Sequence, residues 1–185
     1  VNIIDGPSAT LTASALSTIG GKTGGVVTVG SALTIEGSAA QVTEALVTDS
    51  TKVVASTAKV TITDTSFSLT ASELSAIGEK TSGAVTLSGS GTITGSGAEV
   101  TAALVTDETK VVAGAAVTAT VSDAITAAAG AAITDVDNIT GAYSGGISDS
   151  LGNLAASGSI SSNLTKVKND DGDVAITIGD NGSTD

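Results

Sequence analysis

Apolar residues follow two different periodicities along the first two thirds of the chain. Segments with apolar residues three or four positions apart, such as Leu16 and Ile19, predict helices of one or two turns, which Ser14 or Ser38 can cap. Each helical segment is followed by short stretches in which apolar and polar residues alternate, and this predicts strands. The expected strands are Val26–Val29, Leu33–Ile35, Val53–Ala55, Val60–Ile62, Ala84–Leu87, Thr92–Thr94, Val111–Ala113 and Val117–Val121.

The same pattern occurs twice, because the sequence repeats itself at a constant offset of 58 positions. Three blocks match without a gap: residues 11–20 match 69–78, residues 42–49 match 100–107, and residues 51–55 match 109–113. A weaker half-period, at an offset of 27 positions, relates Val27 to Val54. Self-similarity at a fixed spacing is the signature of repeat architectures, so the repeat decides how the fold is interpreted.

The repeat predicts a parallel β-solenoid with short helical turns, built from α/β coils of about 27–31 residues. Such a coil cannot bury its apolar face alone, whereas stacked coils pair each strand with its equivalent in the next coil. Val27, Val54, Val85 and Val112 are then expected at equivalent inward positions. Tandem small α+β domains are the alternative, although a repeat unit with almost no aromatic side chain would bury little apolar area.

Three parts are expected along the chain: repeat 1 at residues 1–63, repeat 2 at residues 64–122, and a degenerate third repeat or capping module at residues 123–185. The third part keeps helix-like pieces and ends in the clean alternation Val174–Ile178. Terminal repeats of solenoids are usually atypical because they cover an open end. A different module that interrupts a longer array is the alternative for this part.

Composition narrows the classes of function. The chain has one Phe, one Tyr and seven Lys, and it lacks Trp, Met, Cys, His and Arg. Without His, Cys and Arg, the common general base, thiol nucleophile and phosphate clamp are missing, so we expect no enzymatic activity. The net charge of −12 and the lack of a basic patch in the sequence make nucleic acid and anionic membrane surfaces unexpected partners. No apolar run approaches the ~20 residues of a membrane span, so membrane insertion is not expected either.

An acidic cluster near the C-terminal end is the candidate metal site. Asp170, Asp171 and Asp173 flank Gly172, and a tight loop of carboxylates can supply the oxygen ligands that calcium prefers. The spacing differs from that of an EF-hand loop. An acidic turn is the alternative, because Asp-Gly between apolar runs is a strong turn signal. No other cofactor is expected.

Several phrases resemble the repeats of very large secreted surface proteins of cyanobacteria and related bacteria. They are residues 72–77 (SELSAI), 92–100 (TITGSGAEV) and 147–156 (ISDSLGNLAA). The resemblance covers most of the chain and implies export without a cleavable N-terminal signal to an extracellular or cell-surface location. Such proteins often carry calcium-binding Gly-Gly-x-Gly-x-Asp nonapeptides. This sequence lacks them, so the resemblance does not extend calcium binding to this chain.

Together these features predict a structural subunit or segment of an extracellular surface assembly, such as a fibre, sheath, surface layer or long adhesin. We expect it to act by self-association, because exposed strand edges at the ends of a solenoid recruit another chain unless they are blocked. The residues expected to make this homo-oligomeric or filament contact are Val1, Ile3, Ile4, Val174, Ile176 and Ile178. The alternative is an adhesin or phage-fibre module that recognises surface glycans.

Overall fold

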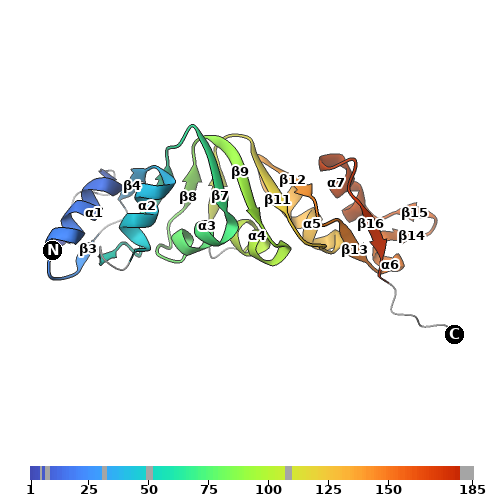
Figure 1. The fold of residues 1–185 in the computed structure, drawn as a ribbon, viewed down its shortest axis with the longest axis horizontal. Helices are drawn as coiled ribbons and strands as arrows, with labels where there is room; N and C mark the ends of the chain where they lie inside the picture. The colour runs from blue at the N-terminus through green and yellow to red at the C-terminus, as the bar shows by residue number, and fades with distance from the viewer. Residues whose placement is uncertain (5, 7–8, 31–32, 49–51, 107–109, 180–185) are drawn as a thin grey trace.

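The computed structural model describes residues 1–4, 6, 9–30, 33–48, 52–106 and 110–179, in which helices and strands follow one another along an elongated body (Figure 1). The helices are α1 (Ala13–Lys22), α2 (Ala39–Leu46), α3 (Ala71–Gly78), α4 (Gly97–Leu104), α5 (Ala127–Thr134), α6 (Leu151–Leu154) and α7 (Ser162–Asp170). The strands are β1 (Asn2–Ile3), β2 (Thr10–Thr12), β3 (Val27–Val29), β4 (Thr34–Gly37), β5 (Val53–Val54), β6 (Lys59–Ile62), β7 (Ser66–Thr70), β8 (Val85–Leu87), β9 (Ser90–Gly95), β10 (Val111–Ala113), β11 (Val117–Val121), β12 (Ile139–Tyr143), β13 (Ile147–Asp149), β14 (Ala155–Ala156), β15 (Ser159–Ile160) and β16 (Ile176–Ile178). The expected combination of short helices and short strands is confirmed.

Parallel pairing joins most strands into ladders. The strand orders are β1-β3-β5, β10-β8-β6-β4-β2 and β12-β11-β9-β7 in the three larger sheets. The last part of the chain adds a parallel pair, β13 with β16, and the antiparallel pair β14 with β15. In the larger sheets the paired residues are 22 to 26 positions apart, from Val117 with Ile139 to Val27 with Val53. The fold is therefore an α/β structure with parallel sheets.

Hydroxyl side chains define where the helices begin. Ser38 caps α2 as expected, in a capping box with Gln41: each side chain accepts a hydrogen bond from the backbone N–H of the other. The same capping box occurs at the starts of α3 and α4. In α1 the cap is Thr12 and not the expected Ser14. A hydroxyl that satisfies a first-turn amide stabilises a helix by ~1 kcal/mol, so these residues fix the helix starts locally.

Carboxylates from later segments of the chain also bind the helix starts. Asp64 Oδ2 accepts a hydrogen bond from Ala39 N at 2.7 Å, and Asp123 Oδ1 accepts one from Gly97 N at 2.5 Å. Asp149 does the same for the first residue of α5, at 3.1 Å. A carboxylate at this place satisfies a free N–H group and interacts favourably with the positive end of the helix dipole. The partners are 22 to 26 positions apart, so these contacts join neighbouring segments of the body.

The core is a continuous cluster of mostly small aliphatic side chains that extends from Ala13 to Val174. Tyr143 is the largest fully buried side chain among the described residues. Its hydroxyl donates to Gly130 O at 2.8 Å and lies 3.0 Å from the Thr134 hydroxyl. A buried hydroxyl without a partner would be costly, so these contacts explain how the core accepts a phenol.

The expectation that four equivalent valines point inward is wrong for two of them. Val27 and Val85 are fully buried, whereas Val54 and Val112 are 47% and 50% exposed. The register pairs Val27 with Val53, one residue before Val54, and the same offset applies at Val112. Because side chains alternate between the two faces of a strand, a shift of one residue exchanges inside and outside. Moreover, β8 pairs with β6 and not with β5.

Candidate functional site

The acidic cluster at the end of α7 covers the edge of a sheet. Asp170 Oδ2 accepts a hydrogen bond from Gly141 N, and Asp171 Oδ2 accepts one from Tyr143 N, both at 2.8 Å. Both amides belong to β12, the outermost strand of its sheet, and they are two positions apart, as expected for groups on one edge of a strand. The two carboxylates therefore occupy donors that an edge strand would otherwise offer to another chain.

This arrangement gives two carboxylates of the expected calcium site other partners. Asp170 and Asp171 are directed at backbone amides, while Asp173 is exposed and has no hydrogen-bond partner among the described residues. Within the described ranges, no group of three or more His, Cys, Asp or Glu side chains could hold a metal ion. The three carboxylates do not converge, because the packing of α7 against β12 gives two of them other partners.

The C-terminal strand presents two exposed isoleucines. In β16, Ile176 is 41% exposed and Ile178 is 56% exposed. This strand pairs with β13 on one side and is the outer member of its sheet. Val174 lies before the strand and is buried against the core, so its expected place in the exposed contact is wrong.

The N-terminal strand is also an outer strand, but it is anchored in its own sheet. The Val1 ammonium donates to Val26 O at 2.8 Å, and β1 pairs with β3. Ile3 is half-buried against the core, whereas Val1 and Ile4 are 60% and 77% exposed. The far edge of β1 has no partner strand in the described part of the chain. Exposed apolar side chains thus flank β1 and lie on β16, two outer strands near the two ends of the chain.

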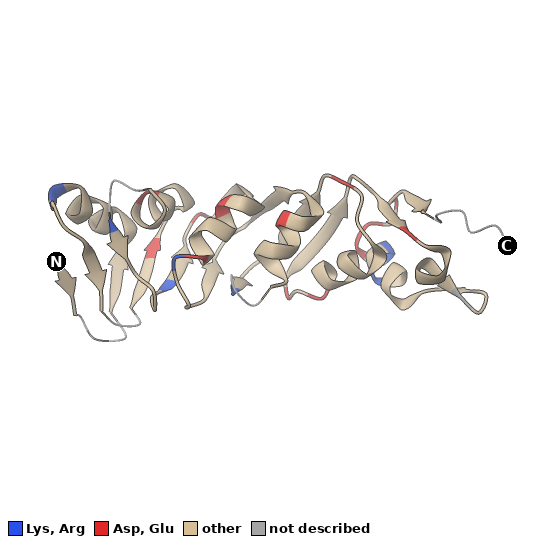
Figure 2. Cartoon of the chain, turned by 90° about the horizontal axis from the view of Figure 1, so that it is seen from below, with Lys and Arg blue, Asp and Glu red and all other residues tan. Residues whose placement is uncertain are grey.

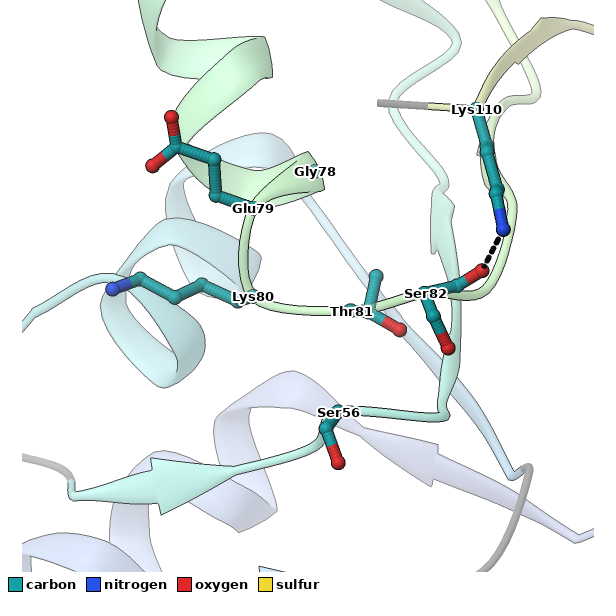
Figure 3. A pocket seen from close by; sticks show the side chains of 7 residues that line it. All are labelled: Ser56, Gly78, Glu79, Lys80, Thr81, Ser82 and Lys110. Atoms are coloured by element: carbon teal, nitrogen blue, oxygen red, sulfur yellow. Dashed lines mark hydrogen bonds between the residues drawn. The ribbon is translucent and has the colours of Figure 1, made fainter. Parts of the chain in front are cut away.

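Two adjoining grooves bring together lysines that are far apart in the sequence. The larger, of about 600 Å³, is lined by Lys80 and Lys110, and Lys110 Nζ donates to Ser82 O at 2.8 Å (Figure 3). The smaller, of about 320 Å³, is lined by Lys52 and Lys80. Glu79 lines both grooves. Each groove therefore combines two lysines with one acidic side chain.

The sequence does not show that these lysines line adjoining grooves, because Lys52, Lys80 and Lys110 are separated by 28 and 30 positions. The available signal was the match of Lys52 to Lys110, and of Lys22 to Lys80, at the repeat offset of 58 positions. Elsewhere the lysines lie at separate places along the body, and Figure 2 shows no uniformly basic face.

Another groove shape occurs twice at equivalent positions. Thr43 and Asp64 line one groove of about 540 Å³, and Thr101 and Asp123 line another of about 630 Å³. The two threonines are 58 positions apart in the sequence and the two aspartates 59. Each groove lies where the chain leaves one sheet for another, beside β7 or beside Ile125. Both aspartates already accept a helix-start amide, so these grooves follow from the architecture and indicate no particular ligand.

Three titratable groups respond to their surroundings. Hydrogen bonds from the Asn153 side chain and from two backbone amides hold the pKa of Asp149 below its ordinary value of 3.8, against the effect of burial. Backbone and side-chain hydrogen bonds from Ser96 hold the pKa of Glu99 below 4.5. Burial raises the pKa of Tyr143 above 10, and the neighbouring carboxylates add to this effect. All three shifts follow from contacts that order the fold.

Comparisons with known protein families, with curated proteins and with solved structures found no match. Among the helices of the described residues, none has both the length and the apolar character needed to cross a membrane. Function is therefore inferred from the sequence and geometry of this chain.

Proposed function

We propose that the chain is a structural segment of an extracellular surface assembly, built as a parallel α/β solenoid whose ends associate with further copies. The observation that carries this proposal is the series of parallel ladders with an outer, uncharged strand at each end of the body. The lack of His, Cys and Arg supports a non-catalytic role. The resemblance to repeats of large secreted bacterial surface proteins supports the extracellular location.

In this solenoid each repeat unit contains two coils and a step. Leu11 pairs with Ile35, and Ile35 pairs with Val60, so two coils carry the chain from position 11 to position 60. The rest of the unit leads from Val60 to Leu69 in β7, which belongs to another sheet. The next strand, β8, pairs with β6 and so remains in the sheet that contains β4 and β6. The coils are thus shorter than the expected length of about 27–31 residues. At the end of each unit the chain begins a new sheet beside the previous one.

A similar step supports a third repeat in residues 123–185. After β11, Ile125 forms a bridge with Ile147 of β13, and β13 pairs with β16. Meanwhile β12 joins β11, as β8 joins β6. Strand β12 therefore extends the sheet that contains β11, and β13 begins a new sheet with β16. Helix α7 ends the series, because its last residues cover the edge of β12.

We place self-association at the outer strands nearest the two ends of the chain, β1 and β16. A second copy cannot add to β12 without displacing the end of α7, but β16 carries Ile176 and Ile178 and no charged side chain. Strand β1, flanked by the exposed Val1 and Ile4, is an equally uncharged edge. Pairing of β1 with β16 of the next copy gives a head-to-tail contact that can propagate into a filament.

Charged substitutions on β16 test this contact. Ile176→Lys with Ile178→Lys should abolish concentration-dependent association in sedimentation velocity, because lysine on an edge strand opposes pairing. The matched control is Val54→Lys with Val112→Lys. These valines have similar exposure and lie on β5 and β10, which are outer strands of other sheets.

Loss of association in the β16 variant and its retention in the control would support the proposal. Removal of residues 1–4 should have the same effect as the β16 substitutions. Wild-type chain that remains monomeric at millimolar concentration, or equal association of both variants, would contradict terminal pairing.

An adhesin that recognises glycans is the second candidate. The lysine-lined grooves favour it, because the smaller one is lined by Lys52 of repeat 1 and Lys80 of repeat 2.

A further inference from the structure

Four lysines form a series along the chain, which we term the lysine row: Lys22, Lys52, Lys80 and Lys110. They follow one another at intervals of 30, 28 and 30 positions. Lys52 Nζ donates to Gly24 O at 3.4 Å, two positions after Lys22. In the same way, Lys110 Nζ donates to Ser82 O at 2.8 Å, two positions after Lys80. Lys80 connects these pairs, because it lines one groove with Lys52 and another with Lys110. The row therefore crosses successive segments of the body.

The backbone does not require lysine at two of these positions. Lys52 and Lys110 have φ angles of 51° and 45°, in the left-handed region that favours Gly and Asn. Their carbonyl oxygens accept hydrogen bonds from Val27 N and Val85 N, so this conformation serves strand pairing. Asn138, with φ of 61°, has the same role between β11 and β12. Since Asn meets the backbone requirement there, the fold alone does not explain the two lysine side chains.

The ammonium groups of the row form no ion pair with another described residue, and the two that donate to carbonyls keep further N–H donors. The ion pair between Lys166 and Asp135 is the one present among the described residues, and it lies outside the row. Ser56 and Ser82 add exposed hydroxyls to the larger groove. In Figure 3, Lys80 extends away from Lys110, so the cations are spread along the surface and do not form one compact pocket. The acids at positions 49, 107 and 108 lie outside the described residues.

We infer that the lysine row binds the carboxylate or sulfate groups of an acidic polysaccharide that lies across the coils. A polyanion with many charged groups can contact several separated cations at once, which a small anion cannot do. Hydroxyls beside the lysines can pair with sugar hydroxyls. Nucleic acid fits less well, because the chain has no arginine and the grooves have no aromatic side chain on which bases could stack.

The chain has a net charge of −12, so a polyanion is attracted to the lysine row only if salt screens the repulsion from the acidic residues elsewhere. At physiological salt the screening length is ~8 Å, so distant acids have little influence on a polymer in contact with the lysines. Glu79, which lines both grooves, lies close enough to weaken the attraction. Each exposed contact is weak, and useful affinity comes from several contacts to one polymer. The site is separate from the terminal strands, so it can be present or absent whether or not the chain self-associates.

The test compares wild-type chain with the row variant K52Q/K80Q/K110Q in binding to dextran sulfate and to polygalacturonate at about 150 mM salt, near the ionic strength at which screening isolates the row. Neutral dextran and single-stranded DNA serve as further probes. Affinity electrophoresis measures binding, and thermal unfolding checks the fold. Glutamine keeps an N–H donor for the carbonyl contacts but removes the charge. Wild type should bind at least one acidic polysaccharide, and the row variant should lose about fivefold per lysine, or roughly 100-fold in total.

A matched control is K59Q/K166Q/K168Q, which changes the net charge by the same three units outside the row. It should bind within about threefold of wild type, since screening leaves distant charges little influence. Equal losses in the two variants would overturn the proposal, because net charge alone would then explain binding. Absence of binding by wild type, or binding of neutral dextran or DNA as strong as that of the acidic polysaccharide, would overturn it as well.

Discussion

The contact between α7 and β12 predicts a specific cost for losing one carboxylate. Asp171→Ala removes a charge-assisted hydrogen bond to Tyr143 N, a class of bond worth about 1.5–3 kcal/mol. Asp171 is partly exposed, so water can replace some of this, and we expect a loss of about 1–2 kcal/mol. For a chain of this length, that lowers the melting temperature by about 3–6 °C. Thermal unfolding followed by circular dichroism measures it.

Asp173→Ala is the matched control, because it makes the same change in net charge at an exposed carboxylate without a hydrogen bond among the described residues. It should leave the melting temperature unchanged within about 1 °C, as expected for a surface substitution. The double variant Asp170→Ala/Asp171→Ala should also associate more readily than wild type, because the amides of β12 become available. Equal melting temperatures for the Asp171 and Asp173 variants would refute the edge-covering role. A fall in melting temperature on adding chelator would return calcium to consideration.

Three further predictions use other contacts. The pKa of the single tyrosine, measured by ultraviolet absorbance, should lie above its ordinary value of 10, because burial disfavours the phenolate. The stability that neutral Tyr143 contributes is complete below pH 10 and is lost as the pH rises through this raised pKa. The pKa of Asp149 is lowered, so its contribution is complete above pH 3.8 and lost as pH falls through the lower value; in acid unfolding, Asp149→Asn should remove this part of the pH dependence. Finally, Lys110→Val should be less stable than Lys110→Asn by about 1–2 kcal/mol in chemical denaturation, because a β-branched residue is strained at φ 45°.

Local structure could be predicted from the sequence because its causes act over a short stretch of chain. The expected strands Val111–Ala113 and Val117–Val121 coincide with β10 and β11. Alternation of apolar and polar positions is enough to locate such strands. Ser38 was recognisable as a helix cap for the same reason, since its hydroxyl reaches only the next turn.

Register and the change of sheet could not be predicted in this way. Halving the repeat offset gives 29 positions, but Leu11 and Ile35 pair at a distance of 24 positions. The pairing distance is shorter than 29 positions because the last part of each repeat unit leads the chain into β7, a strand of another sheet. The alternation of β7 resembles that of the other strands, so the sequence does not show this change of sheet. Alternation determines which face of a strand is buried, but not which sheet the strand joins.

The residue types of the acidic cluster were likewise not enough to predict what its carboxylates bind. Carboxylates on a short loop suit calcium and also suit backbone amides. The choice depends on the packing of α7 beside β12, which brings Gly141 and Tyr143 within hydrogen-bond distance of the cluster. The lysine row could not be predicted for a related reason, because its members line adjoining grooves only after several strands have paired.

The strengths of the two proposed contacts explain how they would work together. A strand as short as β16 offers about three backbone hydrogen bonds to a second copy, each with a net value of ~1 kcal/mol, plus partial burial of Ile176 and Ile178. Association costs at least ~4 kcal/mol in lost translational and rotational freedom, so the end contact alone is weak. A polysaccharide held along the lysine row would raise the effective concentration of neighbouring copies without adding any contact between them. Mixing the chain with a bound acidic polymer should therefore strengthen end-to-end association in wild type. It should not do so in the row variant, although both have the same terminal strands.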